Sequence, residues 1–182
     1  KDIADRGITR TAHSEMFYKL INFSGYRTIV ELGTSLGLNT LYLARAAGHE
    51  GQVISIEGSS ELSDFAKQLA ETNEVSTSRY ICGDFDRVLP ILLDELTNLD
   101  FVYVDGNHSR EATLRYFDLA LPKVHASSVI VFDDIYWSKG MTEAWQTIKQ
   151  HPSVRLSIDT FYFGMVFFDP ALREKTNLRF FI

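Results

Sequence analysis

The chain has 182 residues, of which 45% are apolar and 23% charged, a typical size and composition for one folded domain with a full core. Its formal net charge of −6 argues against nucleic acid as the main partner, because phosphate binding needs a basic face. The absence of a membrane-length apolar run or a secretory leader, together with a single cysteine, predicts a cytoplasmic protein.

Helical and strand patterns alternate along most of the chain. A helical stripe of apolar residues over 10–23 comes first. Short apolar strands are predicted at residues 28–32, 52–57, 78–82, 100–105 and 128–133. Helices are predicted between and after them at residues 39–47, 60–73, 86–96, 109–121 and 139–151. This alternation predicts a parallel sheet with helices on both faces.

The C-terminal part departs from this alternation. Residues 154–159 and 161–168 read as two strands with almost no chain between them, so they must pair as an antiparallel hairpin. The whole pattern predicts a Rossmann-like α/β fold with a mostly parallel, seven-stranded sheet. We expect this domain to cover residues 28–182, preceded by an N-terminal helical segment over residues 1–27 that forms a short or truncated cap.

The first predicted strand ends in an acid and continues into a glycine-rich turn, Glu31-x-Gly33-x-x-x-Gly37. Such a turn lets a ligand lie against backbone at a helix N-terminus, where free N–H groups favour acidic groups. The spacing is neither G-x-G-x-x-G nor a P-loop, which ends in Gly-Lys-Ser/Thr. An ordinary turn that keeps glycines for chain geometry is the alternative.

A carboxylate stands at or just after the end of every predicted parallel strand. These acids are Glu31, Glu57, Asp84, Asp105 and the pair Asp133 and Asp134. Ligands of open α/β sheets bind at the carboxyl ends of the strands, and clustered acids favour cationic or hydrogen-donating ligands. Capping of the following helices is the alternative explanation.

The turn motif, the strand-end acids and the terminal hairpin together resemble class I S-adenosylmethionine-dependent methyltransferases. The stretches VELGTSLG, GDF, DGNH and FDDIYWSKGM, with the acid at position 57, are similar to a bacterial branch close to the catechol-type, metal-dependent O-methyltransferases. The resemblance implies the methyltransferase sheet, S-adenosylmethionine as cofactor and methyl transfer to a hydroxyl of a small molecule. It does not identify the acceptor.

The resemblance also implies a set of cofactor contacts. Glu31 would lie near the methionine end, Glu57 near the ribose and the GDF stretch near the adenine, although a capped turn explains GDF equally well. The implied cofactor-binding residues are Glu31, Gly33, Thr34, Ser35, Gly37, Asn39, Glu57, Gly58, Asp84, Phe85 and Asp105.

Three of the strand-end acids are candidate metal ligands. Asp105, Asp133 and Asp134 would supply hard oxygen ligands at one edge, which suit Mg²⁺ or Ca²⁺. In the catechol-type enzymes such a metal binds there and aligns the acceptor hydroxyl. Asp134, however, stands where that family commonly has Asn.

His108 stands where the catechol-type enzymes have a general-base Lys. Imidazole takes up protons near neutral pH, so we expect His108 and Asp105 to be catalytic residues. Capping of the following helix is the alternative role for His108. Trp137 is a candidate wall of an acceptor pocket, whereas Trp145 has the spacing of a core residue.

Two other functions remain compatible with the sequence. One is an NAD(P)-dependent oxidoreductase on a related sheet, which the missing G-x-G-x-x-G and the terminal hairpin disfavour. The other is a non-catalytic cofactor-binding module. The expected partner is a small-molecule methyl acceptor, with no nucleic acid and no membrane, and a homodimer is compatible with the chain. Cys82, in the third strand, is expected to be a buried apolar side chain.

Overall fold

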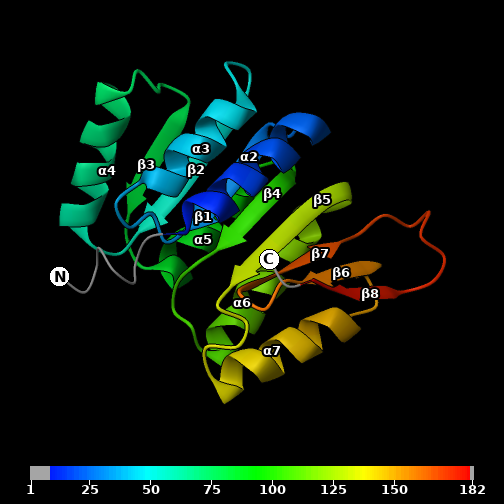
Figure 1. Ribbon diagram of the computed structural model, residues 1–182. Coiled ribbons are helices and arrows are strands. Elements are labelled where there is room, and N and C mark those ends of the chain that lie inside the picture. The colour runs from blue at the N-terminus through cyan, green and yellow to red at the C-terminus, as the bar shows by residue number, and fades with distance from the viewer. Residues whose placement is uncertain (1–8, 181–182) are drawn as a thin grey trace. The chain divides into compact units, whose positions relative to one another are not determined.

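The computed structural model describes residues 9–180 of the chain (Figure 1). Residues 1–8, part of the predicted N-terminal helical segment, lie outside the described residues. The chain divides into two compact units, one up to Val88 and one from Leu89 onward, and each is described by itself. The division predicted between residues 27 and 28 stays a prediction.

Parallel strands and the helices that join them make up the first unit. Its elements are α2 (Thr11–Ser24), β1 (Thr28–Leu32), α3 (Leu38–Ala47), β2 (Gln52–Glu57), α4 (Ser60–Thr72) and β3 (Ser78–Cys82). The strands lie in the order β3-β2-β1 and all run parallel. Helix α2 packs along α3, which contacts β1 and β2, while α4 contacts β2 and β3. This arrangement brings the ends of β1, β2 and β3 to one edge.

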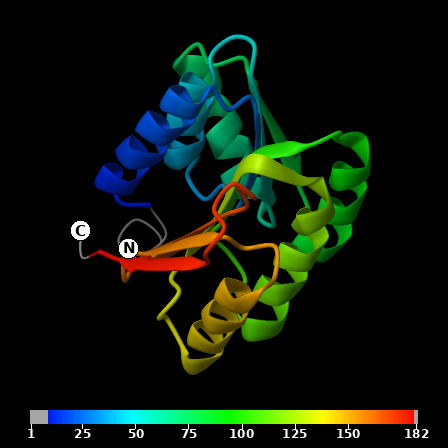
Figure 2. The same cartoon turned by 90° about the vertical axis from the view of Figure 1, so that its right-hand side faces the viewer.

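The second unit adds the C-terminal strands and two long helices. Helix α5 (Phe85–Glu95) spans the boundary and is followed by β4 (Leu99–Val104), α6 (Arg110–Ala120), the 3₁₀ turn η1 (Leu121–Lys123), β5 (Val124–Asp133), α7 (Lys139–Gln150), β6 (Leu156–Asp159), β7 (Phe163–Phe167) and β8 (Thr176–Arg179). The strands lie in the order β4-β5-β7-β6-β8. β4 and β5 are parallel, β7 is antiparallel to β5 and β6, and β8 runs parallel to β6. Figure 2 shows β6 and β8 side by side.

Helix α7 of the second unit packs against its neighbours through buried side chains. Trp145 of α7 is fully buried, as its spacing predicted, and its ring lies over Gly164 of β7. A Cβ atom on Gly164 would lie 2.6 Å from the ring, so only glycine allows this contact. Met141, also on α7, is buried and accepts a hydrogen bond from Thr113 of α6. The apolar face of α7 is therefore core.

The mixed α/β class and the antiparallel C-terminal hairpin are confirmed, with two corrections. The described residues hold eight strands rather than the seven predicted, and the additional strand is β8. Its residues, TNLR, are all exposed and lack the apolar alternation that marks a half-buried strand. Cys82 is exposed rather than buried, because it ends the edge strand β3. Among the described residues, no helix has the length and apolar character needed to cross a membrane.

Candidate functional site

The turn between β1 and α3 has the backbone conformation that its glycines suggest. Gly33 and Gly37 have φ values of +100° and +77°, and Ser35 also lies in the left-handed region at +49°. A Cβ atom on Gly37 would lie 2.7 Å from the Cβ of Ala66 on α4. Chain geometry therefore requires Gly37 whether or not a ligand binds, which was the alternative explanation for this motif.

Among the described acids of the first unit, Glu31 is the most buried, with 0% of its surface exposed. Its carboxylate accepts hydrogen bonds from Asn39 Nδ2 at 2.8 Å, Thr40 Oγ1 at 2.5 Å and Ser55 Oγ at 2.6 Å. Burial raises the pKa of Glu31, and these hydrogen bonds offset part of that rise. The carboxylate is thus held in one position by three donors.

Sequence reasoning missed two of those donors. Ser55 interrupts the apolar strand β2, and its hydroxyl is also 2.6 Å from Thr34 Oγ1. Thr40 lies one residue after the predicted ligand Asn39. The one available signal was a polar residue in the middle of a buried strand, since a buried hydroxyl needs a hydrogen-bond partner.

Asn39 carries an unsatisfied acceptor beside Glu31. Its Oδ1 atom is buried and has no hydrogen-bond partner among the described residues. Buried polar atoms are nearly always paired, so such an atom needs an explanation. A group with several N–H donors, such as an alkylammonium, would bond to both Asn39 Oδ1 and the Glu31 carboxylate. The residues present therefore fit the amino-acid end of a bound cofactor.

Glu57 ties the glycine-rich turn to the loop that follows β2. Its Oε2 accepts from the backbone N–H of Ser35 and its Oε1 from that of Ser59, each at 2.9 Å. Each carboxylate oxygen has a further lone pair that can accept from a hydroxyl. Gly58 lies between these contacts and has open space beside its Cα. The predicted ribose contact remains compatible with this geometry.

The GDF stretch begins α5. Asp84 Oδ1 accepts from the backbone N–H of Asp86 at 2.9 Å, and Phe85 is the first residue of the helix. The helix-capping alternative is therefore present in the structure. The adenine contact of Asp84 and Phe85 stays a prediction.

A histidine–carboxylate pair follows β4 in the second unit. His108 Nε2 lies 3.6 Å from Asp105 Oδ1, and the Tyr103 hydroxyl donates to Asp105 Oδ2 at 3.3 Å. Both side chains of the pair are partly exposed. The helix-capping alternative for His108 is wrong, because Ser109 is the N-cap of α6 and accepts from Ala112 N.

Asp133 at the end of β5 is electrostatically crowded. Burial, followed by the charges of Asp105 and Asp134, raises its pKa well above the ordinary value, and a hydrogen bond with Tyr103 offsets part of this. Asp134 has a left-handed backbone, with φ of +51°. The Tyr103 hydroxyl thus lies between the Asp105 and Asp133 carboxylates.

The predicted metal ligands do not form a metal site in this structure. Within residues 9–180, no three His, Cys, Asp or Glu side chains are placed to hold a metal ion. Asp105, Asp133 and Asp134 therefore do not fit Mg²⁺ or Ca²⁺ as they stand.

Trp137 lies in the turn after β5 and faces solvent, with 66% of its surface exposed. Its ring centroid is 6.5 Å from that of His108, and the rings are tilted by 44°. An exposed tryptophan beside a histidine–aspartate pair can form one wall of an acceptor site. The sequence did not decide the role of Trp137, and this placement favours a role as a wall of an acceptor pocket.

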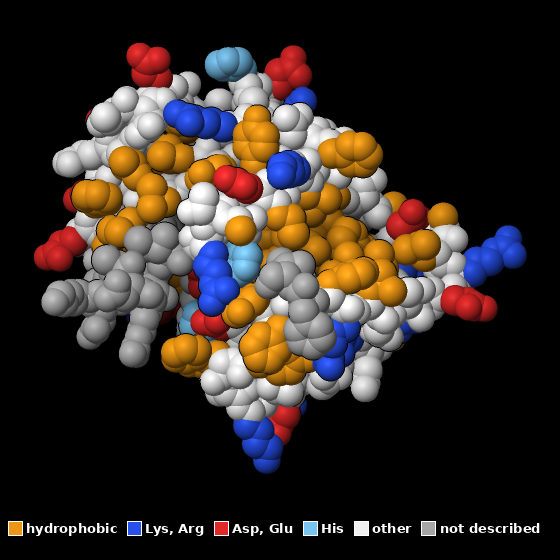
Figure 3. Space-filling model, viewed as in Figure 1, with side chains coloured by type: hydrophobic (Ala, Val, Ile, Leu, Met, Phe, Trp, Pro, Cys, Tyr) orange, Lys and Arg blue, Asp and Glu red, His pale blue; other side chains and the backbone are white. Residues whose placement is uncertain are grey.

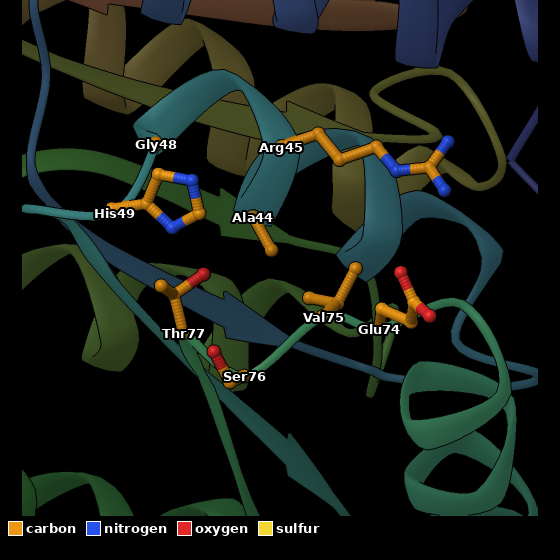
Figure 4. Close-up of a pocket in the computed structure, with 8 residues that line it drawn as sticks. All are labelled: Ala44, Arg45, Gly48, His49, Glu74, Val75, Ser76 and Thr77. Carbon is orange, nitrogen blue, oxygen red and sulfur yellow. The ribbon is translucent and has the colours of Figure 1, made fainter.

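A separate cavity of about 160 Å³ lies where α3 ends and β3 begins (Figure 4). His49 and Arg45 extend to different sides of it, and Ser76 and Thr77 supply hydroxyls. It lies at the opposite ends of these elements from Glu31, so we do not assign it to the cofactor.

On the described part of the face in Figure 3, Lys and Arg side chains are scattered and form no continuous basic patch.

Comparisons with known proteins find similar domains and folds. A family model described as a methyltransferase domain matches residues 30–135. Catechol O-methyltransferase of Mycobacterium tuberculosis is 30% identical over 123 residues, which are 63% of this chain and 51% of that protein. The chain thus spans about half the length of this curated relative.

Solved structures share the fold. The O-methyltransferase TomG from Streptomyces achromogenes, in complex with S-adenosylmethionine, has a TM-score of 0.78 at 20% identity, covering 89% of this chain and 82% of TomG. A Bacillus cereus O-methyltransferase in complex with S-adenosylhomocysteine has a TM-score of 0.77 at 21% identity, covering 89% and 83%. At this identity the likeness establishes the Rossmann-like methyltransferase fold and no more.

Proposed function

We propose that this chain, which belongs to the methyltransferase-domain family, transfers a methyl group from S-adenosylmethionine to a hydroxyl of a small molecule. The observation that carries the proposal is the buried Glu31 carboxylate beside the unpaired Asn39 Oδ1. Together they offer acceptors to an ammonium group at the carboxyl end of β1, where ligands of such sheets bind. The catechol O-methyltransferase relative supports the hydroxyl acceptor.

The residues of the first unit would bind and orient the cofactor. Glu31 and Asn39 would accept hydrogen bonds from its ammonium group, and Glu57 would accept from its ribose hydroxyls. The backbone of the glycine-rich turn, residues 33–37, would lie against the methionine portion. When bound, S-adenosylmethionine supplies an electrophilic methyl group on a sulfonium.

The residues of the second unit would prepare the acceptor. His108 takes the proton from the acceptor hydroxyl, and the hydroxyl oxygen becomes the nucleophile. Asp105, 3.6 Å from His108 Nε2, stabilises the imidazolium that results. Trp137 packs against the acceptor and holds its hydroxyl near His108.

Isothermal titration with S-adenosylhomocysteine tests the cofactor assignment directly. We expect one site per chain, together with methyl transfer from S-adenosylmethionine to catechol or a related phenol. No binding at millimolar ligand would exclude the proposal. Binding without turnover across a panel of phenols, catechols and sugars would instead favour a cofactor-binding module.

Exchanging Asp105 for Asn tests the histidine–aspartate pair. An amide cannot stabilise the imidazolium as a carboxylate does, so we expect kcat to fall by roughly tenfold or more. The affinity for S-adenosylhomocysteine should stay within several-fold. Assays run with a chelator and with added Mg²⁺ extend the test to the metal. A loss confined to the Mg²⁺ assay would show that Asp105 acts through a metal rather than through His108.

A further inference from the structure

A buried carboxylate that the sequence motifs do not include joins four elements of the second unit. Asp159, at the end of β6, has only 4% of its side chain exposed. Its Oδ2 accepts from Tyr136 OH at 2.6 Å, Trp145 Nε1 at 3.2 Å and Arg179 NH2 at 3.1 Å, while its Oδ1 accepts from Phe161 N at 3.1 Å. The network thus joins the turn after β5, helix α7, and strands β6 and β8.

Charge makes these contacts stronger than neutral hydrogen bonds. Burial alone would raise the pKa of Asp159, but the donated hydrogen bonds outweigh it, so its pKa lies below the ordinary value. The carboxylate is therefore ionised at neutral pH, with the Arg179 guanidinium as its counter-ion. Hydrogen bonds between ionised partners are about twice as strong as neutral ones.

Arg179 contacts the turn after β5 as well as Asp159. Its NH2 donates to Tyr136 OH at 2.6 Å, and its guanidinium carbon lies 5.9 Å from the centre of the Tyr136 ring. The Tyr136 ring also stacks on the Phe161 ring, with centroids 5.5 Å apart. Tyr136 is thus held at both its ring and its hydroxyl.

The residue after Tyr136 is Trp137, which lies beside His108. The turn is closed by a hydrogen bond from Trp137 N to Asp134 O at 2.8 Å. Ser138, the next residue, caps α7 and accepts from Met141 N. Trp137 therefore lies between two residues that are held by hydrogen bonds, Tyr136 and Ser138. The contact of Tyr136 with Arg179 depends on β8, a strand that the sequence patterns did not predict.

We propose that Arg179 of β8 is a positioning residue that holds, through Asp159 and Tyr136, the turn carrying Trp137 beside His108. Its effect on turnover rests on the proposed function, whereas its effect on Trp137 does not. Half of the Arg179 side chain is exposed, so its removal leaves no buried cavity. What remains after removal is a buried carboxylate without its hydrogen-bonded guanidinium and a Tyr136 hydroxyl with one partner fewer.

The test compares Arg179→Met with Arg173→Met, which removes an exposed arginine from the segment before β8. Time-resolved fluorescence anisotropy reads the turn directly, because the chain has only two tryptophans and Trp145 is buried. We expect a larger fast component in Arg179→Met than in wild type or Arg173→Met. The added component should vanish in the Trp137→Phe, Arg179→Met double variant.

Steady-state kinetics with catechol as the acceptor probe forms the second arm. We expect kcat/KM to fall roughly tenfold to hundredfold in Arg179→Met, because small misplacements of binding groups have effects of this size. The affinity for S-adenosylhomocysteine should stay within twofold. Arg179→Lys should restore part of the loss, since an ammonium keeps the charge but cannot form the same planar pair of contacts.

The two arms separate failure of this inference from failure of the proposed function. Unchanged anisotropy in Arg179→Met would overturn the positioning role, whatever happens to the melting temperature. A larger fast component with unchanged kcat/KM would also overturn it, because the turn would then not govern the acceptor. If the wild-type protein binds no S-adenosylhomocysteine, the proposed function fails, and the anisotropy arm still decides whether Arg179 holds the turn.

Discussion

Replacing Glu31 by Gln is expected to weaken binding of S-adenosylhomocysteine by roughly 10- to 100-fold while leaving the protein folded. The carboxylate and an ammonium would form a charge-assisted hydrogen bond worth about 1.5–3 kcal/mol, which corresponds to that range of affinity. Gln has the same shape and can still accept from Asn39 Nδ2, while the hydroxyls of Thr40 and Ser55 can reorient. Isothermal titration measures the loss.

The same variant should change how stability depends on pH. Burial raises the pKa of Glu31, so the folded state holds this proton more tightly than the unfolded state does. Its contribution to stability is therefore fully present below the ordinary pKa of a glutamate and is lost as pH rises through the raised value. At pH values above this raised pKa, the ionised Glu31 lowers the free energy of unfolding. We expect Glu31→Gln to be as stable as wild type at low pH and more stable at pH values above the raised pKa of Glu31, as measured in urea titrations.

The exposed acid Glu71 on α4 offers a matched control. Glu71→Gln removes the same charge from the same unit and should change neither ligand affinity nor the pH dependence of unfolding. If Glu31→Gln bound S-adenosylhomocysteine with wild-type affinity, the proposed contact between Glu31 and the ligand would be wrong. Loss of the folded state in Glu31→Gln would show that the carboxylate serves the fold by pairing Asn39, Thr40 and Ser55.

Replacing His108 by Gln is expected to lower kcat by about 10²- to 10⁴-fold, the usual contribution of a general base. Gln retains hydrogen-bonding atoms but cannot take up a proton from the acceptor hydroxyl. Because His108 belongs to the second unit, whereas Glu31, Asn39 and Glu57 belong to the first, affinity for S-adenosylhomocysteine should stay within several-fold. Initial rates at saturating S-adenosylmethionine and titration of the variant measure both quantities.

His125 provides a control of the same residue type and pairing. Its Nε2 lies 2.8 Å from Asp100 Oδ1, a closer pair than His108 and Asp105, but at the starts of β4 and β5 rather than at their ends. His125→Gln should leave kcat unchanged and at most lower the free energy of unfolding. Equal loss of activity in the two variants, or none in His108→Gln, would contradict the role of His108.

Much of the fold was accessible from local sequence patterns. Strands such as TIVEL and QVISIE combine β-branched residues with burial, and the predicted helices lie within one or two residues of those observed. The terminal hairpin followed from the short connection between its strands, which only an antiparallel pair permits. These features depend on nearest neighbours in the chain, so a single sequence carries them.

Contacts between distant segments were less accessible. The sequence located Glu31 and Asn39 but not Ser55, which lies 24 residues from Glu31 and reaches it only because β1 and β2 pair in register. It predicted a three-carboxylate metal site from strand ends and family resemblance, whereas no three such side chains among the described residues are placed to hold a metal ion. The position of a residue in its strand indicates the sheet edge at which it lies. The direction of its side chain decides whether it can bind one ion together with the neighbouring acids.

By itself, the sequence determined the α/β class, the carboxyl edge of the strands and the acids delivered to it, because hydrophobic periodicity and glycine positions act locally. Only the tertiary structure decided that Glu31 is buried with three donors, that Ser109 rather than His108 caps α6, and that β8 brings Arg179 to Tyr136. The physical reason is that hydrogen bonds and desolvation depend on which surfaces meet in space. A polar, exposed strand such as β8 has no apolar pattern that indicates its position, so the contacts of its residues are known only from the folded structure.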